Sequence, residues 1–136
     1  MTVIGIIPAR YNSSRFPGKS LTNILGKSMI RRVYERAKLS ELKKVIVATD
    51  DKRIVDEVRS FDGEVMMTSS EHISGTDRCF EVAQKIANTN DIIINIQGDE
   101  PFIDPNQINQ LIYAFEDEEV GIVTLCKRIE NTDILV

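Results

Sequence analysis

The sequence predicts an α/β domain with a doubly wound, mostly parallel sheet. Short apolar runs recur along the chain, and each is apolar on both faces, which is typical of strands buried in a parallel sheet. Segments with helical periodicity lie between these runs. The 136 residues are 42% apolar, with seven Gly and four Pro, so the composition favours one folded domain and excludes a disordered or collagen-like chain.

The predicted strands occupy residues 3–7, 44–49, 64–68, 91–97 and 121–125. The first ends at Pro8, the second at Asp50, the third at a pair of serines and the fourth at Gly98. In a doubly wound sheet the ligand lies beyond the carboxyl ends of the strands. The residues that directly follow these strands are therefore the candidates for a functional site.

Helices are predicted between the strands and after the fourth one. Ser28 and Asp51 are the expected caps of the first two helices, and Asp104 caps the last one, with Pro105 at its first position. The apolar residues that mark the four helices are Met29, Ile30, Val33 and Ala37; Ile54, Val55 and Val58; Val82, Ala83 and Ile86; and Ile108, Leu111, Ile112 and Phe115.

Charge is distributed unevenly along the chain. Residues 1–44 contain ten Lys and Arg against two acidic residues, whereas residues 45–136 contain seven against nineteen. A basic amino-terminal third favours an anionic ligand. The chain as a whole has a net charge of -4, so nucleic acid is not an expected partner. We interpret four basic residues of the first helix as a solvated face: Arg31, Arg32, Arg36 and Lys38.

No segment predicts membrane insertion or export. The longest apolar stretches fall far short of the roughly 18 residues that a spanning helix needs, and Met1-Thr2 lacks the basic start of a signal peptide. Cys79 and Cys126 fit neither a disulfide framework nor a zinc ribbon. We interpret both as reduced thiols in the core of a cytoplasmic protein.

The loop after the first predicted strand, residues 8–20, contains three cations and three serines. Arg10, Arg15 and Lys19 can hold phosphates through guanidinium forks and a point charge, and Ser13 adds a hydroxyl. The loop is not a Walker A motif, because Ser13 stands where that pattern requires a glycine five residues before Gly18-Lys19. We predict a phosphate-binding loop; the alternative is a long basic loop without a ligand.

A second candidate site follows the fourth predicted strand, at Gln97-Gly98-Asp99. A carboxylate beside a glycine at a strand end suits Mg²⁺, which proteins hold through one or two carboxylates together with phosphate oxygens of the substrate. The alternative is that Asp99 only begins a turn. Asp99 is accordingly the predicted metal ligand, and Mg²⁺ the predicted cofactor.

A third candidate segment, residues 69–78, joins the third strand to its helix and is rich in small hydroxyl residues. Ser74 and Arg78 lie where they can read a polar edge of a ligand. Thr76 is alternatively the cap of the helix. His72 is the only histidine of the sequence, and we interpret it as a surface residue rather than a catalytic base.

Six short motifs occur in order and at plausible spacing along the chain: IPARY (7–11), SRFPGK (14–19), GKSMI (26–30), VATD (47–50), SGTDR (74–78) and NIQGDEP (95–101). Together they resemble the motifs of the 3-deoxy-manno-octulosonate cytidylyltransferases, also called CMP-Kdo synthetases. The resemblance extends from residue 3 to about residue 126.

The resemblance implies a nucleotidyltransferase fold of the glycosyltransferase-A-like type. It implies transfer of CMP from CTP to 3-deoxy-D-manno-octulosonate (Kdo), with release of pyrophosphate, for lipopolysaccharide biosynthesis. The site residues that it implies are Arg10, Ser13 and Lys19 for the triphosphate, Gln97 for the cytidine, Asp99 for Mg²⁺, and Arg15 and Arg78 for phosphate or base.

The chain departs from the family it resembles in length. Members of that family are nearly twice as long, and their second half supplies dimer contacts, most of the sugar pocket and a second metal-binding Asp. We therefore expect residues 1–136 to be the nucleotide-binding part of a single nucleotidyltransferase domain whose carboxyl-terminal half is absent. The full-length protein is expected to be a homodimer. Residues 131–136 end without a closing helix, which favours the same interpretation.

Three other interpretations compete with this one. A sialic-acid type cytidylyltransferase shares the Pro8-Ala9-Arg10 strand end, but it has a Gly-rich loop and lacks the run from Gln97 to Pro101. A phosphoacceptor receiver domain has this length and alternation, but its acid pair follows the first strand. A non-catalytic CTP-binding fragment is the third alternative.

Overall fold

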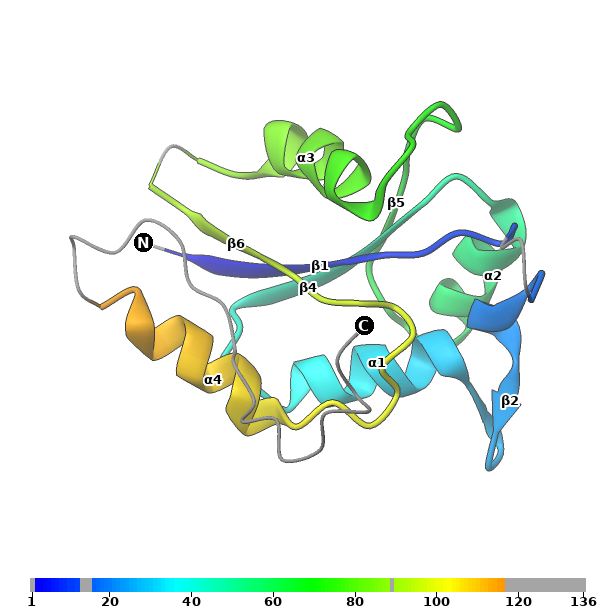
Figure 1. The fold of residues 1–136 in the computed structure, drawn as a ribbon, viewed down its shortest axis with the longest axis horizontal. Helices are drawn as coiled ribbons and strands as arrows, with labels where there is room; N and C mark the ends of the chain where they lie inside the picture. The colour runs from blue at the N-terminus through cyan, green and yellow to red at the C-terminus, as the bar shows by residue number, and fades with distance from the viewer. Residues whose placement is uncertain (1, 13–15, 89, 117–136) are drawn as a thin grey trace, which may run out of the picture.

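A computed structural model describes residues 2–12, 16–88 and 90–116 of the chain (Figure 1). Within these residues, a four-stranded parallel sheet has the order β5-β4-β1-β6. The predicted parallel sheet is confirmed, although the third and fourth strands are shorter than expected, and the strand predicted at 121–125 lies outside the described residues. The strands are β1 (Val3–Pro8), β4 (Lys44–Thr49), β5 (Val65–Met67) and β6 (Ile92–Asn95).

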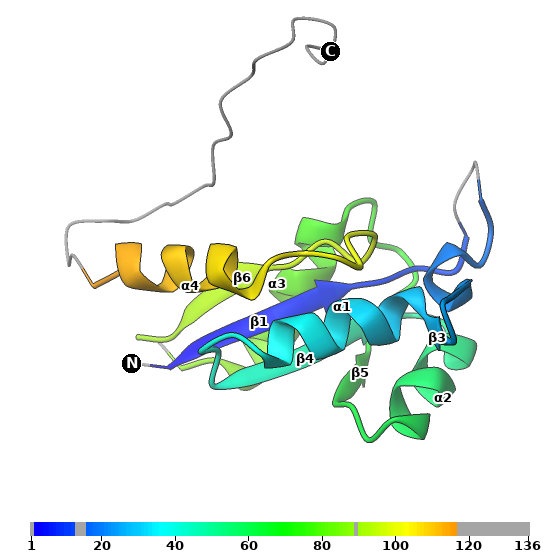
Figure 2. The ribbon, with the colours of Figure 1, turned by 90° about the horizontal axis from the view of Figure 1, so that it is seen from below.

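Helices cover both faces of the sheet, as a doubly wound fold requires (Figures 1 and 2). Ile30 of α1, Ile54 of α2 and Ile108 of α4 pack in one core cluster on one face. Val82 of α3 packs with Ile6 in a second cluster on the other face. The predicted helices are confirmed: α1 (Met29–Lys38), α2 (Lys52–Ser60), α3 (Gly75–Ile86) and α4 (Pro105–Ala114).

Side chains at the amino ends of the helices fix where each helix begins. Ser28, Asp51 and Asp104 cap α1, α2 and α4 as predicted, each accepting a hydrogen bond from a backbone amide two or three residues later. The alternative that Thr76 caps α3 is wrong. Ser74 is the cap, because its side chain accepts from the amide three residues later at 3.1 Å, and Thr76 lies inside the first turn.

A short hairpin between β1 and α1 has no signal in the sequence. It follows the 3-10 helix η1 (Lys19–Leu21) and pairs β2 (Asn23–Ile24) with β3 (Lys27–Ser28) in antiparallel fashion. Its two turn residues, Leu25 and Gly26, have φ of 52° and 94°. Positive φ at both central residues is what a two-residue hairpin turn of type I′ needs, and leucine rarely adopts it.

The basic face of α1 is not merely solvated, contrary to the interpretation of the sequence. The guanidinium of Arg32 donates to the carbonyl of Ile24 at 2.9 and 2.7 Å and to that of Leu25 at 2.6 Å. Arg36 donates to the carbonyl of Ile103 at 2.8 Å. These residues therefore anchor the hairpin and the segment before α4 to α1.

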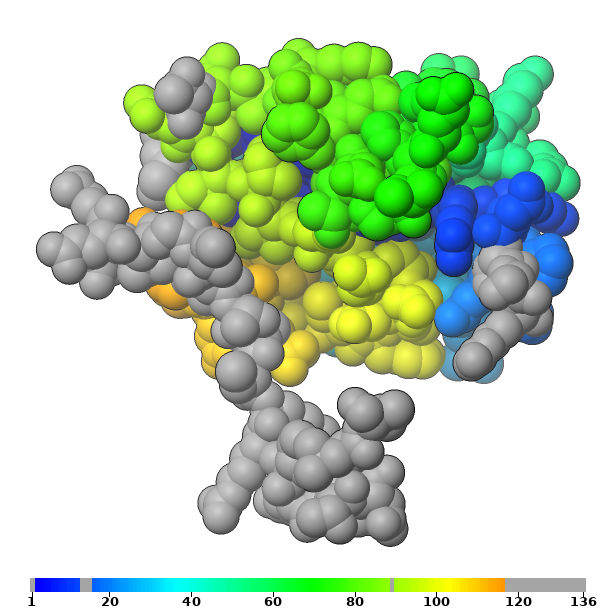
Figure 3. Space-filling model, turned by 45° about the horizontal axis from the view of Figure 1, so that its top comes forward, coloured from blue at the N-terminus to red at the C-terminus, as the bar shows by residue number. Residues whose placement is uncertain are grey.

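The sheet order creates a crevice at the carboxyl ends of β1 and β6. From β1 the chain adds β4 and then β5 on one side, whereas β6 pairs with the other side of β1. The strand order therefore reverses between β1 and β6, and ligands bind at such switch points. Residues after β1 (blue), residues near 70–78 (green) and residues near 100 (yellow) gather on one face of the molecule (Figure 3). Among the helices in the described part of the chain, none has the length and apolar character needed to cross a membrane.

Candidate nucleotide site

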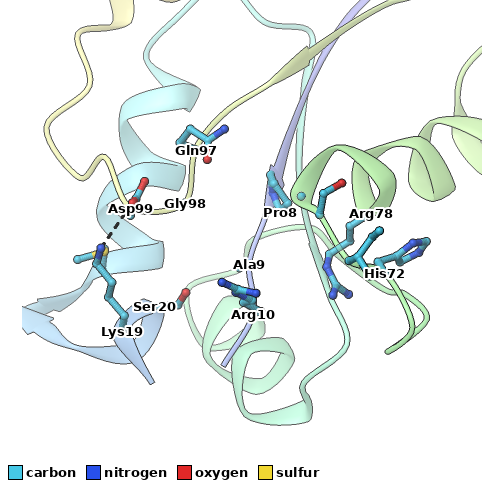
Figure 4. Close-up of a pocket in the computed structure, with 14 residues that line it drawn as sticks. Pro8, Ala9, Arg10, Lys19, Ser20, His72, Arg78, Gln97, Gly98 and Asp99 are labelled. Carbon is cyan, nitrogen blue, oxygen red and sulfur yellow. Dashed lines mark hydrogen bonds and ion pairs between the residues drawn. The ribbon is translucent and has the colours of Figure 1, made fainter. Parts of the chain in front are cut away.

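A cleft of about 310 Å³ lies at this switch point. Three segments form its walls: the residues after β1, the segment that leads into α3, and the turn after β6 (Figure 4). Ser13 and Arg15 lie outside the described residues. The structure brings together the other six residues predicted for the site: Arg10, Lys19, Ser74, Arg78, Gln97 and Asp99.

Arg10 and Gln97 reach the cleft because each is the first residue beyond the strand pairing. The amide of Ala9 still donates to the carbonyl of Ala48 at 2.9 Å, and the amide of Ile96 to the carbonyl of Ile6 at 2.9 Å. Both Ala9 and Ile96 are buried, so the chain turns outward immediately after them. The parallel sheet thus places a cation and an amide side chain at neighbouring strand ends.

Glycine at position 98 lets the two strand ends touch. A Cβ at this position would lie 2.9 Å from the carbonyl oxygen of Pro8, closer than real Cβ atoms approach. Gly98 is therefore required by close packing of the turn after β6 against the end of β1. This packing brings Asp99 to the mouth of the cleft.

An exposed ion pair crosses the cleft between the first and third walls. Lys19 Nζ lies 3.5 Å from Asp99 Oδ2, with 44% and 55% of the two side chains exposed (Figure 4). Gly18, at φ 74°, donates its amide to the carbonyl of Tyr11 at 2.7 Å and so closes the loop before Lys19. The predicted cation and the predicted carboxylate therefore face one another.

Arg78 lies deep in the cleft and is held by the protein. Only 5% of the residue is exposed. Its Nη1 donates to Thr68 Oγ1 at 2.5 Å and to the carbonyl of Ser69 at 3.1 Å, and its Nη2 lies 3.8 Å from Asp50 Oδ2. Arg78 consequently joins the carboxyl ends of β4 and β5 to α3 and adds a fixed positive charge to the cleft.

His72, interpreted from the sequence as a surface residue, is partly buried and lines the cleft. Its Nε2 lies 2.9 Å from Oε1 of Glu81 on α3. The same carboxylate accepts from the amide of Ser69 and from Lys85 Nζ, both at 2.9 Å. Hydrogen bonds from Ser69, Lys85 and His72, in that order of effect, lower the pKa of Glu81 from 4.5 to about 2.

Three further residues of the lining lie in motifs or loops identified in the sequence but were not predicted as site residues. Ser20, Met29 and Ile73 reach the cleft from η1, α1 and the segment before α3. Nothing in their local pattern separates them from ordinary loop or core residues. Only the tertiary arrangement of the three walls identifies them.

The family model for cytidylyltransferases matches residues 4–135. This chain belongs to the cytidylyltransferase family. The match spans all three walls of the cleft, and it excludes the receiver domain considered from the sequence.

The relatives of this cytidylyltransferase chain confirm the resemblance drawn from its six motifs. The 3-deoxy-manno-octulosonate cytidylyltransferase of Parabacteroides distasonis is 55% identical over 133 residues, which are 98% of this chain and 53% of that protein. The protein of the same name from Saccharophagus degradans is 59% identical over 112 residues, which are 82% of this chain and 44% of the relative.

A solved structure of CMP:2-keto-3-deoxy-manno-octonic acid synthetase complexed with CTP has the same fold. It aligns with a TM-score of 0.83 at 46% identity, over 87% of this chain and 48% of that chain. The nucleotidyltransferase fold implied by the motifs is therefore confirmed. The chain spans about half the length of the curated relatives it matches.

The donors in the cleft of this cytidylyltransferase chain fit Mg²⁺ that arrives with a nucleotide. Within the described residues, no group of three or more His, Cys, Asp and Glu side chains could hold a metal. Asp99 provides one exposed carboxylate. Mg²⁺ uses one or two carboxylates together with phosphate oxygens and water, so a single carboxylate beside a basic loop that is predicted to bind phosphate matches its needs.

The chain offers no activated thiol near the cleft in its described part. Cys79 is buried in the core, and burial raises its pKa from 9.0 to about 12. A thiol of this kind stays protonated and does not act as a nucleophile. The expectation of a core thiol is confirmed for Cys79, whereas Cys126 lies outside the described residues.

Proposed function

We propose that residues 1–136 are the CTP-binding part of a nucleotidyltransferase domain. In the whole protein, this domain would transfer CMP from CTP to Kdo and release pyrophosphate. The observation that carries the proposal is the cleft at the switch point, where a cationic loop faces a carboxylate across a cavity of about 310 Å³. The names of the relatives and the CTP in one similar structure support the same substrates.

Arg10 and Lys19 would hold the triphosphate. Both line the cleft on the wall that follows β1, and Lys19 is half-exposed, so its ammonium group is accessible to an anionic ligand. Guanidinium and ammonium groups bind phosphate oxygens through charge-assisted hydrogen bonds. Ser13 and Arg15, on the same loop, are proposed to assist them.

Gln97 and Ser74 would contact the cytidine. They stand on opposite walls of the cleft, and the Gln97 amide offers both a donor and an acceptor to a base edge. Arg78, whose bonds to Thr68 and Ser69 hold it in place, would add fixed positive charge near the nucleotide. A site built to pair with cytosine leaves polar groups unpaired when another base enters, which is a source of discrimination.

Asp99 would hold Mg²⁺ at the mouth of the cleft together with phosphate oxygens of CTP. The ion, when bound, neutralises charge on the phosphates during transfer. Asp99 also faces Lys19 at 3.5 Å, so the carboxylate keeps the ammonium group in the phosphate region when no nucleotide is present.

The chemistry needs no nucleophile from the protein. The anomeric hydroxyl of the sugar acid attacks the α-phosphorus of CTP, a carbon–oxygen–phosphorus linkage forms, and the bond to the leaving pyrophosphate breaks. The hydroxyl proton passes to solvent or to a base. Arg10 and Lys19 would orient the triphosphate and offset its charge, and such positioning accounts for much of the rate in transfers of this type.

Other features of the whole protein remain predictions. We propose that it is a homodimer, that it resides in the cytoplasm, and that its other half completes the sugar pocket. The 136-residue chain alone should then bind CTP without useful turnover, because nothing holds the sugar hydroxyl near the α-phosphorus.

Nucleotide selectivity tests the binding part of the proposal. CTP with Mg²⁺ should protect the chain from thermal unfolding more than UTP or ATP does. Asp99→Asn should reduce the protection that Mg²⁺ adds, whereas Glu100→Gln should not, because Glu100 is the adjacent carboxylate and does not line the cleft. Equal protection by all three nucleotides would mean that the site recognises the phosphates and not the base.

Pyrophosphate release tests the catalytic part of the proposal. The full-length protein is assayed with CTP and Mg²⁺ and with either Kdo or a sialic acid as acceptor. Release that depends on Kdo supports the proposal, and release that depends on sialic acid instead favours the related family. Full-rate turnover by residues 1–136 alone would contradict the assignment of the sugar pocket to the other half.

A further inference from the structure

One wall of the cleft belongs to no helix or strand. Residues 69–74 connect β5 to α3, and His72, Ile73 and Ser74 line the cleft from this segment. Ile73 is 90% exposed, so burial does not hold the segment in place. Specific hydrogen bonds have to do so, because an irregular segment has no strand ladder to fix its position.

Glu81 supplies the central contacts of this wall. Its Oε1 accepts from the amide of Ser69 and lies within hydrogen-bond distance of His72 Nε2, in both cases at 2.9 Å. Its Oε2 accepts from Lys85 Nζ, one turn later on α3. One carboxylate therefore connects two residues of the 69–74 segment, Ser69 and His72, to the helix. The side chains of Glu81 and His72 are each only 19% exposed.

The same helix holds the segment at two further points. Arg78 donates to the carbonyl of Ser69, so the two backbone groups of that residue are bound by side chains from α3. Ser74 caps α3 with its side chain. The position of His72 and Ile73 over the cleft consequently depends on Glu81 between these fixed ends.

The opposite side of the cleft has a separate support. Arg10 and Lys19 follow β1, and Asp99 follows β6. The strand ladder and the contact of Gly98 with Pro8 position Arg10 and Asp99, and the loop closed by the hydrogen bond from Gly18 to Tyr11 positions Lys19. A change at Glu81 should therefore alter the 69–74 wall, next to the proposed cytosine position, without altering the binding of phosphates by Arg10 and Lys19.

We infer that Glu81 is a positioning residue for nucleotide selectivity, which it secures by holding the 69–74 wall of the cleft against α3. The inference rests on the proposed binding of CTP. It assigns to Glu81 no contact with the nucleotide and no part in proton transfer.

The experiment compares four forms of this chain by calorimetric titration: the wild type, Glu81→Ala, Glu81→Gln and Lys85→Ala. Each is titrated with CTP, with UTP and with inorganic tripolyphosphate in the presence of Mg²⁺. Alanine favours helix, so Glu81→Ala should fold, and its helical circular dichroism is checked beforehand. Glu81→Gln keeps an acceptor oxygen for Ser69 and His72. Lys85→Ala is the matched control, because Lys85 contacts Oε2 of Glu81 and not the Oε1 that meets Ser69 and His72.

Glu81→Ala should bind CTP about tenfold more weakly and lose most of the preference for CTP over UTP, while its affinity for tripolyphosphate stays unchanged. Glu81→Gln should recover CTP binding to within about threefold of the wild type, and Lys85→Ala should match the wild type. Equal weakening of CTP and tripolyphosphate by Glu81→Ala, or no weakening of either, would overturn the inference.

Hydrogen exchange of the Ser69 amide tests, without any nucleotide, whether Glu81 holds the 69–74 segment. By nuclear magnetic resonance, Glu81→Ala should lose protection of this amide, and Glu81→Gln and Lys85→Ala should keep it. Retained protection in Glu81→Ala overturns the inference. A wild type that binds tripolyphosphate but shows no preference for CTP would instead overturn the proposed function, and the two failures are therefore distinguishable.

Discussion

Replacing Gly98 by alanine is expected to push apart the two strand ends that form the cleft. The new Cβ would lie 2.9 Å from the carbonyl oxygen of Pro8 and 3.7 Å from Ile7 Cγ2. The oxygen belongs to the backbone of the central strand and cannot rotate away. The turn after β6 must then retreat by about half an ångström to restore an ordinary contact, and overpacking of this kind costs about 1–3 kcal/mol of folding free energy.

The retreat should also change ligand binding, because Asp99 moves with the turn. Asp99 lies 3.5 Å from Lys19, and a further half ångström would take the pair to the limit of an ion pair. Misplacement of binding groups by about 1 Å can cost about a hundredfold in function, so we expect CTP with Mg²⁺ to bind roughly threefold to tenfold more weakly.

Thermal unfolding and calorimetric titration of Gly98→Ala measure the two effects. Gly63→Ala is the matched control: its Cβ would come within 2.7 Å of side-chain atoms of Phe61 and Val58, but Gly63 precedes β5 at the opposite edge of the sheet. The control should lose stability and keep the affinity for CTP. A Gly98→Ala protein with wild-type stability and CTP affinity would refute the reasoning about the strand ends.

Three further predictions concern single groups. Lys19→Ala should weaken CTP binding by about 1.5–3 kcal/mol, through loss of a charge-assisted phosphate contact, and calorimetry with Lys38→Ala at the exposed end of α1 as control measures it. Mg²⁺ should bind weakly alone and more tightly with CTP, because Asp99 is a single carboxylate; equally tight binding without CTP in a titration would contradict this. Glu81 has a pKa lowered from 4.5 to about 2, so its stabilising effect is complete above pH 4.5 and is lost as the pH falls toward 2. The difference in urea midpoint between wild type and Glu81→Gln should narrow over that pH range.

The sheet and the helices could be predicted from the sequence because their signals are local. Runs that are apolar on both faces identify strands of a parallel sheet, and side chains such as Ser28 and Asp104 mark where helices begin. The convergence of Arg10, Gln97 and Asp99 follows from the same rule, since carboxyl ends of parallel strands meet at one edge. The location of the candidate site at these strand ends therefore follows from the sequence pattern and the parallel sheet alone.

The segment before α3 could not be predicted in the same way, because its geometry depends on distant partners. His72 meets Glu81 nine residues later, and Arg78 meets Thr68 ten residues earlier, across a turn whose path no local pattern specifies. The hairpin at Leu25 was missed for a different reason. Its turn places a leucine at positive φ, where Asn or Gly is the usual signal.

The two kinds of cation in the cleft differ in how strongly the protein holds them. Lys19 and Asp99 are both about half-exposed and 3.5 Å apart, and exposed pairs of this kind contribute only about 0–1 kcal/mol. In the proposed complex, a triphosphate with Mg²⁺ would therefore replace the pair at little cost, and each group would turn to the ligand. Arg78 is 5% exposed and donates to the buried hydroxyl of Thr68, so freeing it would leave buried groups unpaired at a cost of about 1–3 kcal/mol each. Lys19 is thus suited to follow the phosphates, whereas Arg78 is suited to act from a fixed position.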